Sequence, residues 1–264
     1  MKRIMRSAYS LLKLFGVDPL KTYNALRGLP SYCRDYIALK KQRHTSVHEF
    51  PFAKLYPCLD DRFTDSGSAN GHYFHQDLLV ARRIFRNQPQ RHVDVGSRID
   101  GFVAHVAVFR AIEVIDIRPL ANNIPNVTFM QADLINPVDA KFIGYCDSLS
   151  CLHAMEHFGL GRYGDQVFYD GYVLGMDNLH RMLKPGGTLY FSVPIGPQRI
   201  EFNAHRVFSV AYLLKCFAGK YRLVQFSWVD DQGDLHENVA INDDTANNSF
   251  GCYYGCGIFE LTKL

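Results

Sequence analysis

One stretch decides the fold of this chain: His92-Val93-Asp94-Val95-Gly96-Ser97-Arg98-Ile99-Asp100-Gly101-Phe102. A short apolar run that carries Asp94 breaks into a glycine-containing turn, and an apolar helical pattern follows. Twenty-two residues after Asp94, a second apolar run ends in another acid, Asp116. An α/β sheet that binds a nucleoside typically has this order of elements: a strand, a glycine turn, a helix, and a second strand that ends in a carboxylate. The stretch therefore predicts a nucleoside-bearing ligand at this turn.

The residues around this stretch alternate between strand-like and helical patterns. Strands are expected from His92 and near residues 113–117, 126–130, 142–147, 188–193, 223–229 and 253–261. A helix is expected over 166–183, and another before the first strand, where apolar residues recur at helical spacing: Phe74, Leu78, Ala81 and Phe85. The alternation favours an α/β, doubly wound, mostly parallel seven-stranded sheet. The last two strands form a hairpin-like pair that adds an antiparallel edge strand.

The charge of the chain is unevenly distributed along its 264 residues. Residues 1–43 hold ten Lys/Arg and two Asp, a net of +8, so the remainder carries −5 of the total of +3. We expect a basic helical arm with an irregular linker over residues 1–70 and one α/β domain over 71–264. The cysteines number seven, an odd count without framework spacing. They predict reduced thiols and a cytoplasmic protein.

The arm has an amphipathic pattern, with Ile4, Ala8, Leu11 or Leu12, and Phe15 on one side. One interpretation is a helix that lies on an anionic membrane, which would make the protein membrane-peripheral through residues 1–43. The other is a helix that packs on its own domain. No apolar run is long enough to span a bilayer.

Polar residues gather where the expected strands end. Ligands of doubly wound sheets bind at these carboxyl ends. The candidates are Asp94, Gly96, Ser97, Arg98 and Gly101 at the first strand, Asp116 and Ile117 at the second, Asp133 and Leu134 at the third, and Asp147, Ser150, His153, Glu156 and His157 at the fourth.

These segments resemble the class I S-adenosylmethionine-dependent methyltransferases, which have a Rossmann-like fold. The matching pieces are Asp94-Val95-Gly96, Asp116, Gln131-Ala132-Asp133, Leu152 to His157, and Leu183-Lys184-Pro185-Gly186-Gly187. More narrowly, GHYFHQDL, DVGSRIDGF, DSLSCLHAMEHFGLGRYGD and FNAHRVF resemble a methyltransferase-like family of unassigned function. Some bacterial members of that family are associated with surface-polysaccharide loci, which implies a role in polysaccharide biosynthesis.

The resemblance implies a role for each strand-end residue toward S-adenosyl-L-methionine. Asp116 accepts the ribose hydroxyls, and Asp133 accepts the adenine amino group beside Leu134. The backbone of Gly96 and Ser97 approaches the methionine part, and Asp94 braces the turn. Ile117, Gly101 and Ser150 complete the expected cofactor contacts.

The turn departs from the superfamily pattern at two positions. Arg98 and Asp100 occupy places where the superfamily commonly has glycine, and Gly101 comes one residue late. Arg98 either pairs with the cofactor carboxylate or fills the pocket and prevents binding. A catalytically silent binding protein is therefore an alternative to the enzyme.

A hydroxyl acceptor benefits from a positioned base. His153 is the first candidate, because it directly follows the fourth strand. Further candidates are Glu156, His157, Asp147 and His205. The alternative for His157 and Glu156 is a hydrogen-bonded pair that braces the loop.

The segment His153-Ala154-Met155-Glu156-His157 also matches the H-x-x-E-H pattern of inverted zinc peptidases. A zinc hydrolase is a further alternative, although a nucleoside-type sheet is the wrong context for that motif. No metal ligand set is expected, and Cys252 and Cys256 are interpreted as buried free thiols. Nucleic-acid binding is not expected, because the basic arm lacks interleaved aromatic residues.

The sequence thus predicts an S-adenosylmethionine-dependent methyltransferase. The expected acceptor is a hydroxyl on a sugar, a glycan precursor or another small polar molecule. The glycine-rich segment from Gly159 to Asp165 is expected to form a lid or acceptor loop, or else a plain connection.

Overall fold

The computed structural model describes residue 9 and residues 12–47 and 50–264. The chain divides into two compact units, Met1–Ser68 and Ala69–Leu264. The first unit contains helix α2 (Pro19–Arg43) and the short helix η1 (Asp61–Phe63). Asp18 caps α2, because its carboxylate accepts hydrogen bonds from the backbone N–H groups of Leu20 and Lys21. The amphipathic helix predicted near residues 4–15 falls mostly outside the described residues.

Gly28 marks where α2 packs against the segment that returns beneath it. A Cβ atom at this position would lie 1.8 Å from the carbonyl oxygen of Leu59, so only glycine fits. Most apolar side chains of α2 remain exposed, among them Leu20, Tyr23, Leu26 and Ile37. Within the described part of the chain, no helix is both long and apolar enough to cross a bilayer.

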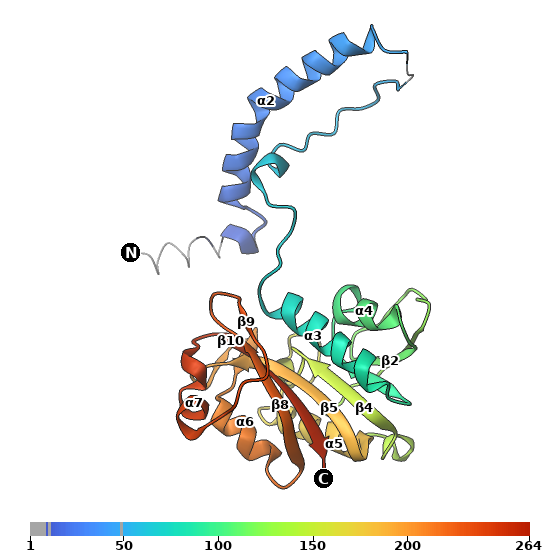
Figure 1. Cartoon of the computed structure of the whole chain (residues 1–264), viewed down its shortest axis with the longest axis vertical. Coiled ribbons are helices and arrows are strands. Elements are labelled where there is room, and N and C mark those ends of the chain that lie inside the picture. The colour runs from blue at the N-terminus through green and yellow to red at the C-terminus, as the bar shows by residue number, and fades with distance from the viewer. Residues whose placement is uncertain (1–8, 10–11, 48–49) are drawn as a thin grey trace. The chain divides into compact units, whose positions relative to one another are not determined.

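The second unit is built on one large sheet (Figure 1). Its strands are β1 (His92–Val95), β2 (Ile112–Asp116), β3 (Val127–Gln131), β4 (Cys146–Leu152), β5 (Leu183–Ile195), β8 (Tyr221–Val229), β9 (Leu235–His236) and β10 (Gly255–Lys263). They lie in the order β3-β2-β1-β4-β5-β10-β8-β9. The pairs from β3 to β5 are parallel, whereas β10 is antiparallel to both β5 and β8, and β9 is antiparallel to β8. The predicted α/β class and mostly parallel sheet are confirmed, but the sheet has eight strands and not seven, because the short β9 pairs with β8.

Helices cover both faces of this sheet. They are α3 (His72–Asn87), η2 (Ile99–Val103), α4 (Ala104–Ala107), η3 (Ala140–Phe142), η4 (Met155–His157), α5 (Gly171–Met182), α6 (Val210–Phe217), α7 (Asp243–Asn247) and η5 (Ser249–Gly251). One core cluster joins α5 and α6 to the sheet, and a second joins α3 and α4 to its other face. A separate small sheet pairs β6 (Arg199–Glu201) with β7 (His205–Val207). The architecture is doubly wound because the helices that precede β2 cover one face of the sheet and α5 and α6, which follow β4, cover the other.

The fourth strand begins and ends later than predicted. The sequence predicted a strand near residues 142–147, whereas β4 spans Cys146–Leu152. Two serines inside β4 suggested a loop, but their hydroxyls have partners on the next strand: Ser148 and Ser150 lie 2.8 and 3.2 Å from the two ring nitrogens of His92. Polar residues are tolerated in a buried strand when they are hydrogen-bonded in this way.

Helix α3 forms where it was predicted but buries a different side. Phe74, Leu78 and Phe85 are exposed, at 40%, 44% and 55% of their surface. The buried side includes Arg83, whose Nη2 donates to the hydroxyl of Ser227 at 3.1 Å and to Asn238 Oδ1 at 2.9 Å. Its Nη1 also lies 3.4 Å from the carboxylate of Glu260. Polar pairing across the core, which apolar spacing does not reveal, therefore fixes the rotation of α3.

Candidate active site

The turn after β1 brings the backbone close to a neighbouring loop. Gly96 has a φ of +73°, and a Cβ atom there would lie 2.8 Å from the Cβ of Ala154. Both facts require glycine. Buried Asp94 holds the turn, since its carboxylate accepts from Ser97 N at 3.1 Å and from the hydroxyls of Ser97 and Ser150 at 2.7 and 2.5 Å. Burial raises the pKa of Asp94 to about 7, although the hydrogen bonds from Ser150 and Ser97 act to lower it.

Ser150, predicted to touch the cofactor, is instead fully buried inside β4. Its hydroxyl donates to Asp94, so it supports the turn from behind. The correction follows from the later position of β4, which places Ser150 within the strand and not after it.

A hollow of about 60 Å³ lies at the carboxyl ends of β1, β2 and β3. Ligands of doubly wound sheets bind at this edge. The predicted residues that line it are Gly96, Asp116, Ile117, Asp133, Leu134, His153 and His157. The fold thus brings together side chains from four separate segments at the edge where the sequence placed them.

The carboxylate of Asp116 is held by an arginine two residues later. Its Oδ1 accepts from Arg118 N at 2.8 Å and from Arg118 Nε at 3.0 Å, and its Oδ2 accepts from Nη2 at 2.6 Å. The guanidinium also lies over the ring of Tyr163, 4.5 Å from its centroid. A carboxylate offers about four acceptor positions. Only a small part of that capacity is free for another ligand while Arg118 remains in place.

Asp133 lies two residues after β3 and, like Asp116, accepts a hydrogen bond from the backbone two residues later. Its Oδ1 accepts from the backbone N–H of Ile135 at 3.0 Å, and its Oδ2 accepts from Asn136 at 3.4 Å. The neighbouring Leu134 is 5% exposed and contributes an apolar wall to the hollow.

Arg98 does not fill the first hollow, as one of the two predictions had it. Its Nε and Nη2 donate to the two carboxylate oxygens of Asp100 at 3.1 and 2.9 Å, and both side chains are more than half exposed. The pair lines a second hollow, about 490 Å³ in volume, together with Tyr73 and Arg162. Arg98 therefore leaves the first hollow open.

Gly101 is required for packing. It lies in η2, and a Cβ atom there would lie 2.7 Å from Oδ2 of Asp77. Burial raises the pKa of Asp77 to about 6. The predicted cofactor role of Gly101 is replaced by close contact between η2 and α3.

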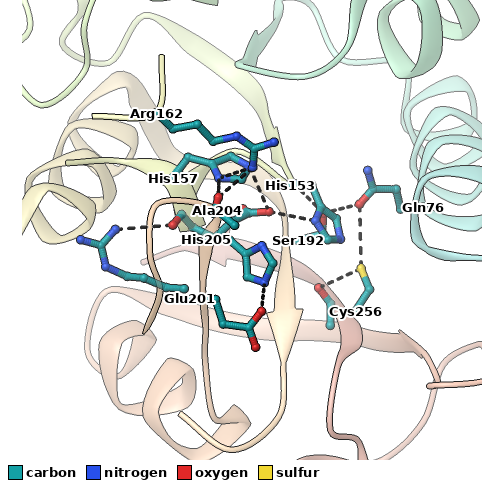
Figure 2. Close-up of polar contacts among 12 residues, drawn as sticks. Gln76, His153, His157, Arg162, Ser192, Glu201, Ala204, His205 and Cys256 are labelled. Atoms are coloured by element: carbon teal, nitrogen blue, oxygen red, sulfur yellow. Dashed lines mark hydrogen bonds and ion pairs between the residues drawn. The ribbon is translucent and has the colours of Figure 1, made fainter. Parts of the chain in front are cut away.

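His153, Glu156 and His157 form a buried group directly after β4. Figure 2 shows the two histidines of this group. The Nδ1–H of His153 donates to Glu156 Oε1 at 2.9 Å. Nε2 of His157 lies 3.7 Å from the same oxygen, and its Nδ1–H donates to the carbonyl of Ala204 at 2.7 Å. Burial opposes protonation of His153, but Cys256 and Glu156 outweigh it and raise the pKa of His153 well above its usual value. Burial lowers the pKa of His157.

This geometry is not that of the zinc peptidase motif. His153 precedes η4 and has a φ of +50°, so it is not one α-helical turn away from His157. The two imidazoles lie on either side of one carboxylate oxygen instead of sharing an ion. The zinc hydrolase built on these three residues is therefore wrong. The predicted hydrogen bond between His157 and Glu156 is also not formed, because the two are 3.7 Å apart; Glu156 instead pairs with His153, and His157 with the carbonyl of Ala204.

Two predicted catalytic residues lie elsewhere. Asp147 is the second residue of β4, at the amino end of the strand, where its carboxylate accepts from the backbone N–H groups of Gln90 and Arg91 at 2.7 Å each. His205 belongs to β7, with Nε2 3.3 Å from Glu201 and its ring beside Tyr254 (Figure 2). Asp147 was misplaced because the end of the fourth strand was predicted too early.

Sequence reasoning missed the residues that approach His153 from α3, β5 and β10. Gln76 accepts a hydrogen bond from the Ser192 hydroxyl at 2.6 Å, and the Cys256 sulfur lies 3.9 Å from the same Gln76 oxygen (Figure 2). His72 stacks on His153 with ring centroids 5.1 Å apart. The spacing of His72 and Gln76 by one helical turn, in the motif GHYFHQDL, was the available signal.

Comparison with known proteins places the chain among uncharacterised relatives. The family of Caenorhabditis proteins of unknown function, DUF268, matches residues 111–249. No curated protein matches the chain.

Solved structures share the fold at low sequence identity. The [4+2]-cyclase SpnF is 13% identical, with a TM-score of 0.50 over 72% of this chain and 80% of that chain. The 1,6-didemethyltoxoflavin-N1-methyltransferase of Burkholderia thailandensis is 15% identical, with a TM-score of 0.49 over 77% and 81% of the two chains. The N-methyltransferase NodS of Bradyrhizobium japonicum WM9 is 12% identical, with a TM-score of 0.47 over 73% and 88%.

The predicted resemblance is confirmed at the level of fold and family. The order of the parallel strands, the antiparallel β10 and the likeness to SpnF all describe one architecture. The chain belongs to the DUF268 family of unknown function and has a Rossmann-like fold that it shares with the [4+2]-cyclase SpnF.

Proposed function

We propose that this protein is an S-adenosylmethionine-dependent methyltransferase. The observation that carries the proposal is the hollow at the ends of β1, β2 and β3, where Gly96, Asp116 and Asp133 lie around one space. In this type of sheet, that edge is where a nucleoside is bound. Asp116 would accept the ribose hydroxyls, Asp133 the adenine amino group, and the Gly96 turn would lie against the methionine part.

The second hollow provides a place for the methyl acceptor. It adjoins the first, because Gly96, Asp116, Arg118, His153 and Tyr163 line both. Its further lining includes Arg98 and Arg162, whose guanidinium groups suit a polar or anionic molecule. We propose a hydroxyl on a sugar or glycan precursor as the acceptor. Methyl transfer mainly requires that the two reactants be held in line, which two adjoining hollows provide.

His153 lies at the boundary of these hollows and is the proposed activating residue. The raised pKa of His153 favours the imidazolium. Once Nε2 has lost its proton, the lone pair is on Nε2, because Glu156 accepts the Nδ1–H. In the chain without a bound ion, this nitrogen would take the proton from an acceptor hydroxyl. The carboxylate would stabilise the imidazolium that results.

A methylation assay tests the proposal most broadly. Full-length protein would be incubated with S-adenosylmethionine and a panel of nucleotide sugars and lipid-linked saccharides. Methyl transfer to one member of the panel is the expected result. Absence of transfer together with absence of cofactor binding would overturn it.

One observation favours a second function, a binding protein without turnover. Arg118 donates three hydrogen bonds to Asp116, the carboxylate proposed for ribose. If this pair is permanent, the first hollow cannot hold a nucleoside in the proposed way. Calorimetry with S-adenosylmethionine separates the two functions, since only the enzyme requires cofactor binding.

We also propose that the arm contacts an anionic membrane surface. The net charge of +8 over residues 1–43 and the exposed apolar residues of α2 support this. Such contact would place a cytoplasmic enzyme near lipid-linked acceptors. Co-sedimentation with vesicles that contain anionic lipid, but not with neutral vesicles, is expected; equal behaviour with both would contradict it.

A further inference from the structure

We propose that His72, His153 and Cys256 form a zinc-binding site. They come from the first residue of α3, the residue after β4 and the second residue of β10. One ring nitrogen of each histidine and the cysteine sulfur all lie within 4.8 Å of one another. This group is distinct from the H-x-x-E-H segment, because only His153 is common to both.

The ligand chemistry fits zinc. Thiolate and imidazole are the donors that structural and catalytic zinc sites use, and three protein ligands leave one position open. In a tetrahedral site with zinc–nitrogen distances of about 2.0 Å and zinc–sulfur of about 2.3 Å, neighbouring donors lie roughly 3.5 Å apart. Metal binding would therefore draw the donors inward by roughly 1 Å. His72 is only partly buried, so rotation of its side chain provides this movement.

An unpartnered nitrogen points to a ligand at this place. The side chain of His153 is 3% exposed, and its Nε2 has no hydrogen-bond partner among the residues that the structure describes. Buried polar atoms in proteins nearly always have a partner. Its other nitrogen is fixed by Glu156 at 2.9 Å, the arrangement by which a carboxylate orients a metal-bound histidine.

Charge balance favours the same ion. A divalent zinc ion, the Cys256 thiolate and the buried Glu156 carboxylate sum to zero, so the cluster is neutral without further counterions. Buried charge is tolerated when it is paired or bound to metal in this way. Cys256 is fully buried. That burial suits a metal ligand and does not suit a cysteine that attacks a substrate, which must be accessible.

The site adjoins the proposed acceptor hollow, which His153 lines. A bound ion would take the lone pair of His153, and the ion, instead of the imidazole, would then favour deprotonation of a hydroxyl that reached it. Zinc binding itself does not rest on the proposed methyltransferase function. Its failure would leave the cofactor hollow untouched, and the absence of cofactor binding would leave the zinc site untouched.

The test uses full-length protein in which the exposed Cys33 and Cys58 are replaced by serine, so that zinc cannot bind to them. Metal content would be measured by elemental analysis after dialysis against dilute zinc. Cobalt(II) would serve as a spectroscopic probe of thiolate coordination. One zinc per chain and a thiolate-to-cobalt charge-transfer band are expected.

Cys256→Ser should abolish the cobalt band, and His72→Gln should weaken zinc binding by about 100-fold. Cys252→Ser is the matched control, since Cys252 is also buried but lies outside the cluster. It should keep both the band and the affinity. Melting curves would show whether the variants fold. If Cys256→Ser does not fold, His72→Gln still tests the site, because His72 is only partly buried. No zinc in the parent protein, a band that persists in Cys256→Ser, or equal loss in Cys252→Ser would overturn the proposal.

Discussion

The hollow at the ends of β1, β2 and β3 and the cluster around His153 are built in different ways. The hollow takes its polar residues from consecutive strand ends, each within a short stretch of chain. The cluster brings together His72, His153 and Cys256 from three distant segments, and the rings of His72 and His153 stack. A cofactor site can therefore follow from topology alone, whereas the chemistry beside it depends on which elements pack together.

The largest expected effect separates these two regions. His153→Ala should lower methyl transfer by roughly 10²- to 10⁴-fold, because it removes the activating nitrogen. Cofactor affinity should stay unchanged, since the proposed cofactor contacts lie at the strand ends. Rate measurements and calorimetry on the same preparation check both expectations. His105→Ala, on the exposed side of α4, is the control, and equal turnover in His153→Ala and the parent would remove His153 from the mechanism.

The second expected effect concerns the pH dependence of the turn. The pKa of Asp94 is raised to about 7 from 3.8 in the folded state, so the folded protein holds a proton that the unfolded chain releases. Stability from this group is therefore present at low pH and is lost as pH rises from 3.8 to about 7.

The variant Asp94→Asn removes this titration. The free energy of unfolding of the parent protein, minus that of the variant, should decrease across the window by at most about 4 kcal/mol. Urea unfolding at several pH values measures it. A difference that stays flat, or that increases with pH, would show that Asp94 is ionised in the folded protein.

The third expected effect is steric. Gly96→Ala would place a Cβ atom on a residue with a φ of +73°, 2.8 Å from the Cβ of Ala154. It should lower the free energy of unfolding by about 3 kcal/mol. Gly219→Ala has a φ of +72° but no atom within 4 Å, so it should cost only about 1 kcal/mol. Urea unfolding gives both values. Equal costs would show that the contact between the turn and Ala154 is unimportant.

The smallest expected effect tests how firmly Arg118 holds Asp116. Arg118→Ala should strengthen binding of S-adenosylmethionine by up to about fivefold, because the guanidinium of Arg118 is half-exposed and such an ion pair contributes about 1 kcal/mol. Calorimetry measures the change. Weaker binding would mean that Arg118 contacts the cofactor and does not compete with it.

Much of the fold could be predicted because its evidence is local. The strands β1, β2 and β3 contain apolar runs bounded by turns, and Asp116 and Asp133 mark where two of them end. The fourth strand was misplaced because Ser148 and Ser150 look like loop residues until His92 is known to lie beside them. Local pattern carries no information about a partner on another strand.

The residues of the candidate site differ in the same respect, since local sequence predicted some of them and not others. Gly96, Asp116 and Asp133 reach the first hollow as predicted, whereas Ser150, Gly101 and Asp147 do not. The contribution of His72 and Cys256 could not be seen, because 184 residues separate them in the sequence. Their meeting depends on the rotation of α3, which polar contacts such as those of Arg83 determine.

The central claim is that the hollow holds S-adenosylmethionine, and isothermal calorimetry with the full-length protein tests it most directly. We predict a single binding site with micromolar affinity that Asp116→Ala abolishes and Arg118→Ala strengthens. Absence of binding at millimolar cofactor, in both the parent protein and Arg118→Ala, would contradict the account.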